Sequence, residues 1–167
     1  MPETVQQYIE RLLGYTGSKD ALKLQAAAPK KAAALLKGKD RKRLLRRPAP
    51  GKWSVGEIVA HLADVELAIG WRIRQILTQN GVTIQAYDQD VWASTFEYRK
   101  RDPRQSLATY AALRAANVAL LRSVPARLWD NYGMHEERGR ETVTQVVRLA
   151  AGHDLNHLLQ IERILKG

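Results

Sequence analysis

A stripe of residues spaced alternately three and four positions apart runs through residues 142–165. Its members are Val143, Val146, Ala150, His153, His157, Gln160 and Ile164. Side chains at this spacing lie on one face of an α-helix, and such a face is typical of a helix that packs in a bundle. Two imidazoles belong to this inward face. Burying them there costs stability unless their nitrogens have partners.

Further long helices follow from the same periodicity. We predict one from Ser54 to about residue 79, ended by Asn80-Gly81, and another from Pro103 to about Ser123. The helix starts carry capping signals, in which a side chain accepts from free backbone N–H groups. These signals are Ser54-x-x-Glu57, Thr142-x-x-Gln145 and Asp102-Pro103.

Shorter helices are predicted around these three. They cover residues 3–13, residues 18–38, a short segment after Asp40, and residues 88–100. Pro29 should kink or divide the second of them, because proline lacks the N–H that an interior turn needs. Strand signals are almost absent, and residues 124–140 are predicted to be mostly loop. The expected fold is therefore all-α: an antiparallel four-helix bundle with additional short helices, in one domain covering residues 1–167.

Composition limits the chemistry. Apolar residues make up 45% of the 167, enough for a core, and there is no cysteine, which excludes disulfides and thiolate metal ligands. The start, Met1-Pro2-Glu3-Thr4, has no signal-peptide pattern, and no apolar run reaches the ~20 residues of a membrane span. We therefore expect a cytoplasmic protein.

The net charge of +10 belongs to one segment. Residues 19–52 hold 12 Lys or Arg and two acidic residues, while the remainder is balanced at 15 of each. A basic segment can attract nucleic acid or acidic membrane surface. It has no interleaved aromatic residues for base stacking, so a solvated helical face is the preferred interpretation and nucleic-acid binding is ranked last.

The histidines are the candidate ligands. His153 and His157 are four residues apart, which places both imidazoles on one helix face. His61 lies on the predicted helix 54–79, which has an equally strong apolar stripe. Zincin metalloproteases use H-E-x-x-H, but here the pattern is H-D-L-N-H, so their catalytic glutamate is missing. Three histidines with open coordination positions predict a catalytic kind of divalent metal site.

Two segments also resemble a known family. Residues 52–66 (KWSVGEIVAHLADVE) and residues 152–161 (GHDLNHLLQI) are similar to the signatures of the DinB-like (YfiT-like) helical bundles. The resemblance covers nearly the whole chain. It implies a bundle, often a homodimer, with a zinc or nickel ion on His61, His153 and His157; iron would also accept such ligands.

The resemblance implies two kinds of chemistry. Relatives include metal-dependent transferases that use low-molecular-weight thiols, and a metal-dependent hydrolase role has also been proposed. The primary hypothesis is a metal-activated thiolate or water that attacks an electrophilic small molecule. A metal-stabilised binding or stress-response module without catalysis is the alternative from another class.

Several further residues are candidates for supporting roles. Asp64, Glu57 and Gln160 could orient an imidazole, although Glu57 is better explained as a helix cap. His135 could act as a general acid or base, against the preferred interpretation of an exposed loop histidine. The four tryptophans, Trp53, Trp71, Trp92 and Trp129, are predicted to be core anchors rather than a substrate box.

Overall fold

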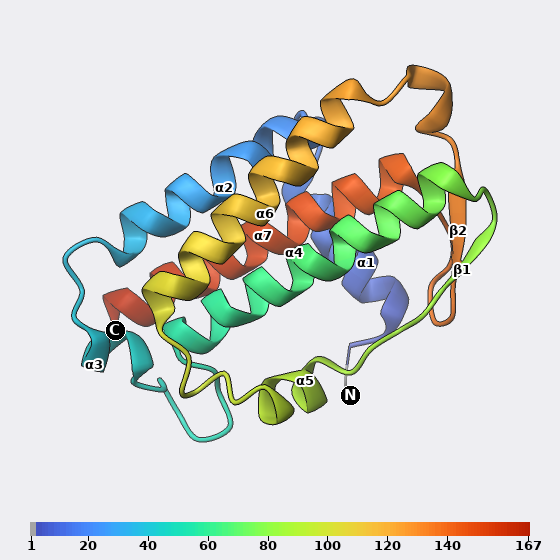
Figure 1. Cartoon of the computed structure of the whole chain (residues 1–167). Coiled ribbons are helices and arrows are strands. Elements are labelled where there is room, and N and C mark those ends of the chain that lie inside the picture. The colour runs from blue at the N-terminus through green and yellow to red at the C-terminus, as the bar shows by residue number, and fades with distance from the viewer. Residues whose placement is uncertain (1–2) are drawn as a thin grey trace.

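The computed structural model describes residues 3–167, and four long helices form its bundle (Figure 1). They are α2 (Ala21–Leu36), α4 (Val55–Thr78), α6 (Pro103–Ser123) and α7 (Val143–Lys166). α2 and α7 run in one direction, and α4 and α6 run in the opposite direction. Each of α2 and α7 is in contact with a helix of opposite direction, so the predicted antiparallel bundle is confirmed.

The long connection between α4 and α6 makes these two neighbours parallel. Residues 79–102 return the chain to the end of the bundle where α4 began. They contain strand β1 (Val82–Ile84) and the short helix α5 (Gln89–Thr95), which replaces the longer helix expected over residues 88–100. All three predicted helix starts carry the expected caps, at Ser54, Asp102 and Thr142.

Helix α1 (Val5–Thr16) lies outside the bundle against α7. It continues through Gly14 and ends at Thr16, three residues later than expected, with Gly17 as its C-cap. The contact is close at Gly152 of α7, where an added Cβ would lie 2.2 Å from the carbonyl oxygen of Leu12. Only a glycine permits this close approach, and the contact brings α1 over the segment of α7 that carries His153.

Pro29 lies inside α2, which is a single helix rather than two. Proline leaves the carbonyl four residues earlier without its helical donor. Here that carbonyl belongs to Gln25, and the Arg114 guanidinium of α6 donates to it at 3.1 Å. The neighbouring helix therefore supplies the missing hydrogen bond.

A three-stranded sheet was not predicted, and the expectation that residues 124–140 are mostly loop was wrong. Strands β2 (Tyr132–His135) and β3 (Gly139–Thr142) form an antiparallel hairpin, and β1 pairs with β2 in parallel. A short 3-10 helix, η1 (Ala126–Leu128), precedes them. The strands have only three or four residues each, too few for a visible alternation, and β1 finds its partner about 50 residues away.

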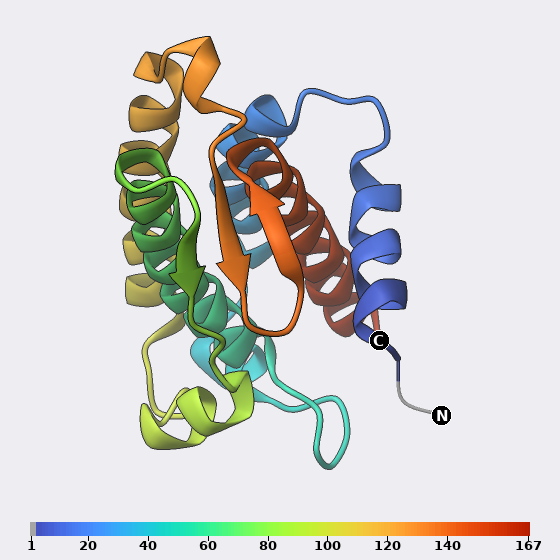
Figure 2. The ribbon, with the colours of Figure 1, turned by 90° about the vertical axis from the view of Figure 1, so that its right-hand side faces the viewer.

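The sheet lies across α4 and α7 (Figure 2). Ile84 of β1 is buried there with Ile73 and Ile76 of α4 and Val143 of α7. A second core cluster fills the other end of the bundle, where the short helix α3 (Arg41–Leu45) contributes Leu44. As predicted, Asp40 caps α3.

Two surface features bear on the predictions. The basic side chains of residues 19–52 are exposed or half-buried on α2, α3 and the adjoining loops, as a solvated face requires. Trp71 is 63% exposed, so the expectation that it anchors the core was wrong, while Trp53 packs against the core. None of the helices within residues 3–167 has the length and apolar character needed to cross a bilayer. Met1 and Pro2, part of the segment assessed for a signal peptide, lie outside the described residues.

Candidate metal centre

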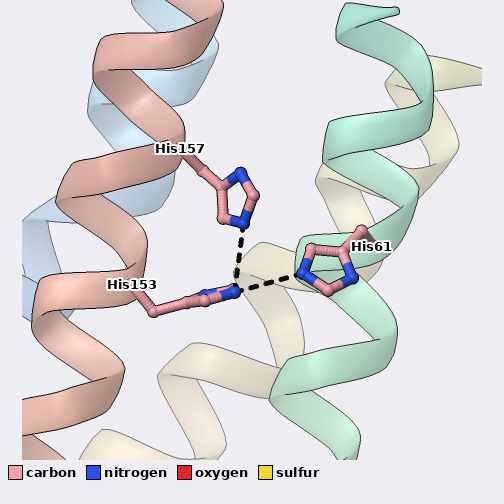
Figure 3. Close-up of side chains that lie close together, drawn as sticks. All are labelled: His61, His153 and His157. Carbon is pink, nitrogen blue, oxygen red and sulfur yellow. Dashed lines mark hydrogen bonds between the residues drawn. The ribbon is translucent and has the colours of Figure 1, made fainter. Parts of the chain in front are cut away.

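Three imidazoles from two helices meet in the bundle (Figure 3). His61 comes from α4, and His153 and His157 come from successive turns of α7. The Nε2 atom of His153 lies 3.1 Å from the Nε2 of His61 and 3.1 Å from the Nε2 of His157. One nitrogen of each ring lies within 4.8 Å of the other two, so the three residues brought together by sequence reasoning also meet in space.

Local structure explains this convergence. The capping box at Ser54 starts α4 two turns before His61, and the four-residue spacing directs His153 and His157 to one side of α7. α4 and α7 are neighbours in the bundle, so their inward faces oppose each other. His61 is 2% exposed, which places its ring in the core rather than at the surface.

Burial keeps these histidines neutral. It lowers the pKa of His61 and His153 well below the usual value, and the neighbouring imidazoles lower them further. Burial also lowers the pKa of His157 to about 4. A neutral imidazole has one nitrogen lone pair available, which is the form that binds a metal.

Gln160 determines which nitrogen of His157 is free. Its Oε1 lies 3.0 Å from His157 Nδ1 and can only accept, so Nδ1 carries the proton. The lone pair is then on Nε2, the atom that points at the cluster. The predicted supporting position of Gln160 next to an imidazole is therefore present.

The donor set fits a metal ion. With Zn–N bonds of about 2.0–2.1 Å, two tetrahedral nitrogen ligands lie about 3.4 Å apart and two ligands at a right angle about 3.0 Å apart. The observed spacing of 3.1 Å lies between these values. Without a cation, these three ring nitrogens would have mainly one another as partners in the core, and a lone pair left there without a donor costs free energy.

Two predicted supporting residues lie elsewhere. Asp64 accepts from the Tyr98 hydroxyl at 2.8 Å and from Arg101 at 2.9 Å, so it serves an ion pair and does not orient an imidazole. Glu57 caps its own helix and pairs with Arg47, which confirms the capping interpretation.

A cavity of about 180 Å³ opens beside the imidazoles. His61 and His153 line it, together with side chains from α1, α4, α7, the hairpin and the loop after β1. Its lining is mixed, with an apolar part including Leu12, Val65 and Val146 and a polar part including Arg72 and Arg138. Its size suits a small organic molecule.

His135 lies in the lining of this cavity, on β2. It is only 3% exposed, so the interpretation as an exposed loop histidine was wrong. Burial lowers its pKa, and the charges of Arg138 and Arg72 lower it further. Its Nδ1 accepts from the Glu137 N–H at 3.2 Å, which leaves the proton on Nε2, and this buried Nε2 has no partner among residues 3–167.

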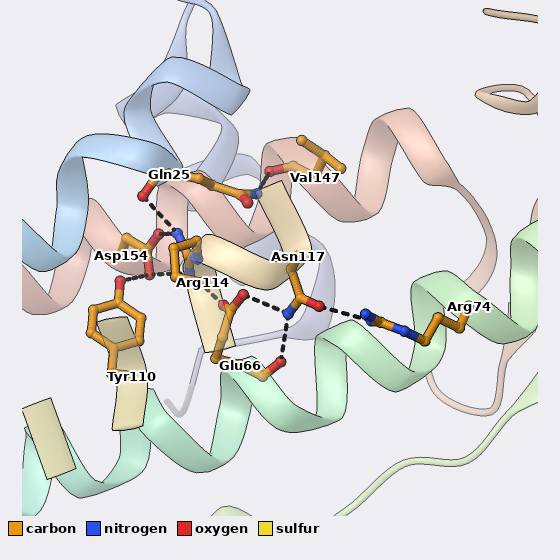
Figure 4. Close-up of polar contacts among 8 residues, drawn as sticks. All are labelled: Gln25, Glu66, Arg74, Tyr110, Arg114, Asn117, Val147 and Asp154. Atoms are coloured by element: carbon orange, nitrogen blue, oxygen red, sulfur yellow. Dashed lines mark hydrogen bonds and ion pairs between the residues drawn. The ribbon is translucent and has the colours of Figure 1, made fainter. Parts of the chain in front are cut away.

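A buried ionic network that includes Asp154, the residue after His153, was not predicted (Figure 4). Arg114 of α6 donates to Glu66 at 2.6 Å and to both oxygens of Asp154. Tyr110 donates to Asp154 and Asn117 donates to Glu66. The spacing of Tyr110, Arg114 and Asn117 along one helix face was a signal for this network. The charge of Arg114, however, is typical of a side chain exposed to solvent.

Comparison with known proteins agrees with the helical bundle, and the relatives that it finds are described as candidate metal-dependent hydrolases. A candidate metal-dependent hydrolase of Oceanobacillus iheyensis is 27% identical over 117 residues, which cover 70% of this chain and 67% of that protein. The candidate metal-dependent hydrolase YfiT of Bacillus subtilis is 28% identical over 116 residues, which cover 68% of this chain and 65% of that protein. The matches thus span about two thirds of each relative.

The solved structure of YfiT, described as having an unusual four-helix bundle topology, superposes with a TM-score of 0.82 at 21% identity. The match covers 98% of this chain and 88% of that one. The family model of the DinB superfamily matches residues 26–161, which include all of the bundle helices up to Ile161 except the first turn of α2. With its bundle and its three convergent histidines, this chain belongs to the DinB superfamily.

Proposed function

We propose that His61, His153 and His157 bind one divalent metal ion, and that the chain is a metal-dependent enzyme acting on a small molecule in the adjoining cavity. The observation that carries this proposal is the convergence of three Nε2 atoms, with His61 and His153 in the wall of a cavity of about 180 Å³. Zinc and nickel suit the donor set, and iron would also accept it.

A bound divalent ion with an open position lowers the pKa of a coordinated water or thiol, which supplies a nucleophile near neutral pH. The chain's own residues prepare the site for it. Gln160 holds His157 in the tautomer with Nε2 free. Leu12, Val65 and Val146 make part of the cavity apolar, which strengthens electrostatic interactions within it.

The finer proposal is transfer of a low-molecular-weight thiol to an electrophile. Asp154 occupies the position next to His153 where a zincin has its glutamate, but its oxygens accept from Arg114 and Tyr110 in the core. It therefore cannot take a proton from a nucleophile in the cavity. A thiol ionises more readily than water and has less need of a general base.

Hydrolysis is the second candidate, favoured by the names of the relatives. Water would then be the nucleophile, and His135 is the candidate residue to assist it. In its neutral form His135 can donate from Nε2 to a substrate oxygen, which is a positioning or charge-stabilising role.

Elemental analysis of purified protein tests the metal site. Wild type should contain close to one metal ion per chain, and His157→Ala should lose most of it. His135→Ala is the matched control, because it removes a cavity histidine outside the cluster and should retain the metal. Equal sub-stoichiometric metal in wild type and His157→Ala would refute the site.

Activity of the metal-loaded protein separates the candidate reactions. Electrophilic acceptors are offered with and without low-molecular-weight thiols, and esters or amides are offered in water alone. Thiol-dependent product supports transfer, and thiol-independent product supports hydrolysis. Metal that binds with neither product, and without an exchangeable water, supports a non-catalytic module.

We also propose that the chain acts in the cytoplasm as a homodimer; the homodimer is what the family resemblance implies. Leu67 and Trp71 are 58% and 63% exposed and lie one turn apart on α4, an apolar pair that a second copy would cover. Light scattering of wild type and Trp71→Glu tests this. A dimer that becomes monomeric in the variant supports the proposed surface, and a monomeric wild type refutes the dimer.

A further inference from the structure

The polar part of the cavity contains a guanidinium without a carboxylate partner. Arg72 of α4 is half-buried, and within residues 3–167 no carboxylate oxygen lies within 4.0 Å of its nitrogens. Of its five N–H donors, one is used by the Gln85 carbonyl at 2.9 Å. Burial lowers the pKa of Arg72, so the protein pays a desolvation cost for this charge.

The other arginine of the cavity differs in this respect. Arg138 donates twice to Glu141, at 2.6 and 2.9 Å, and this pair is nearly neutral as a unit. Arg72 has no such direct pair: within residues 3–167, Glu141 and Glu137, which also line the cavity, act on its charge only from beyond ion-pair distance. Tyr87 holds it in place, with the guanidinium 5.2 Å from the ring centroid.

His135 adds a second unused donor in the same cavity. Its Nε2–H is buried and has no acceptor in the described chain. A buried donor without a partner costs free energy, so such groups are uncommon unless a ligand uses them. Both residues line the cavity, and the positive charge of Arg72 lowers the pKa of His135.

The position of Arg72 along α4 sets the length of the ligand. His61, Val65, Ile69 and Arg72 line the cavity in sequence along one helix face. Eleven residues of helix span about 16 Å between the backbones of His61 and Arg72. Apolar side chains line the part between.

We infer that Arg72 binds the carboxylate of a small substrate whose apolar body lies over Val65 and Ile69 and whose reacting group lies at the three histidines, with His135 donating to a substrate oxygen. This inference rests on the proposed function of the cavity. A planar guanidinium matches a carboxylate in shape, and one positive charge neutralises one negative charge. A phosphate dianion would leave a negative charge uncompensated in a half-buried site.

Binding of three matched probes tests the inference. Phenylpropionate, phenylpropionamide and phenylethylphosphonate share an aromatic body and differ in the head group. They are titrated by calorimetry into zinc-loaded protein and into protein freed of metal by a chelator. The metal-free arm excludes direct binding of the carboxylate to zinc, and it reports on Arg72 even if the three histidines bind no metal.

We expect metal-free wild type to bind phenylpropionate at least about tenfold more tightly than the amide or the phosphonate, as one charge-assisted pair implies. Arg72→Gln should lose this preference, and Arg72→Lys should retain part of it. Arg122→Gln, which removes an exposed arginine of α6, should bind as wild type. Circular dichroism confirms that each variant is folded.

Several outcomes would overturn the inference. They are equal binding of the carboxylate and the amide, tighter binding of the phosphonate, unchanged binding in Arg72→Gln, or no binding of any probe by wild type. Failure of the proposed metal site is recognised separately, because it appears as absent zinc in the loaded protein and leaves the metal-free titrations intact.

Discussion

Replacing Arg114 by methionine should destabilise the protein strongly at neutral pH and much less in mild acid. Arg114 is 3% exposed in its side chain, and its partners Glu66 and Asp154 are 2% and 3% exposed. Methionine fills a similar volume but leaves two buried carboxylates without a cation. Each keeps one hydrogen bond, from Asn117 and from Tyr110.

The magnitude follows from the cost of protonating a carboxyl group. A carboxylate that cannot remain charged takes up a proton. This costs about 1.36 kcal/mol for each pH unit above the ordinary carboxyl pKa of about 4.3, which amounts to about 3.7 kcal/mol at pH 7. One such group therefore accounts for a loss of about 4 kcal/mol, within the range for breaking a buried ion pair. In a chain of this length that corresponds to a Tm lower by roughly 10–15 °C.

The sign of the pH effect is distinctive. In Arg114→Met the carboxyl pKa is raised in the folded state, so folding gains protons and the penalty shrinks as the pH falls. At pH 5 the cost per carboxyl is only about 1 kcal/mol. Because the histidines are present in wild type and variant alike, their acid effect cancels in the difference.

Urea denaturation of the metal-free proteins at both pH values, followed by circular dichroism, measures this difference. Arg122→Met is the matched control, since it removes an exposed arginine from the same helix and should change stability by less than about 0.5 kcal/mol. A loss below about 1 kcal/mol in Arg114→Met at pH 7, or a loss equal at both pH values, would refute the reasoning.

Three further predictions concern the centre and its surroundings. Gln160→Leu should weaken zinc binding about 10- to 100-fold, because His157 loses the acceptor that selects its tautomer. Competition with a chelator measures the zinc affinity, and an unchanged affinity would contradict the role of Gln160 in orienting His157. Gly152→Ala should cost about 1–3 kcal/mol by displacing α1 at Leu12, whereas Gly14→Ala, with open space around it, should be neutral or stabilising in the same denaturation experiment. Metal-free protein should lose stability as the pH falls below about 6.5. His157 alone contributes about 3 kcal/mol of that loss by pH 4, because its pKa of about 4 in the folded state lies below the unfolded value of about 6.5. Denaturation curves that do not change over this pH range would contradict the last prediction.

The helical part of the fold was predictable because its signals are local. Periodicity along residues 142–165 and the caps at Ser54, Asp102 and Thr142 act within a few residues, and each produced the expected helix start. The candidate metal ligands were predictable for a related reason. Two of them share one helix face, and the third lies on another inward-facing helix, so the bundle itself brings them together.

What remained hidden depends on partners far apart in the chain. The strands of the sheet are too short to show a pattern, and β1 pairs with residues about 50 positions later. Asp64 has a helix position that suits an imidazole partner, yet its carboxylate oxygens accept from Tyr98 and Arg101 instead. His135 belongs to a segment that reads as a loop, and only the hairpin places it in the cavity wall.

The sequence alone therefore determined the bundle, its main helices and the set of histidines that could meet. Tertiary structure alone decided which charges are compensated. Arg114, Arg138 and Arg72 are equivalent as residues, but their surroundings differ. The first lies between two buried carboxylates, the second is paired with Glu141, and the third faces the cavity with no carboxylate of residues 3–167 at ion-pair distance. The free energy of a charge depends on its burial and on its neighbours in space, and neither is written in the local pattern of the chain.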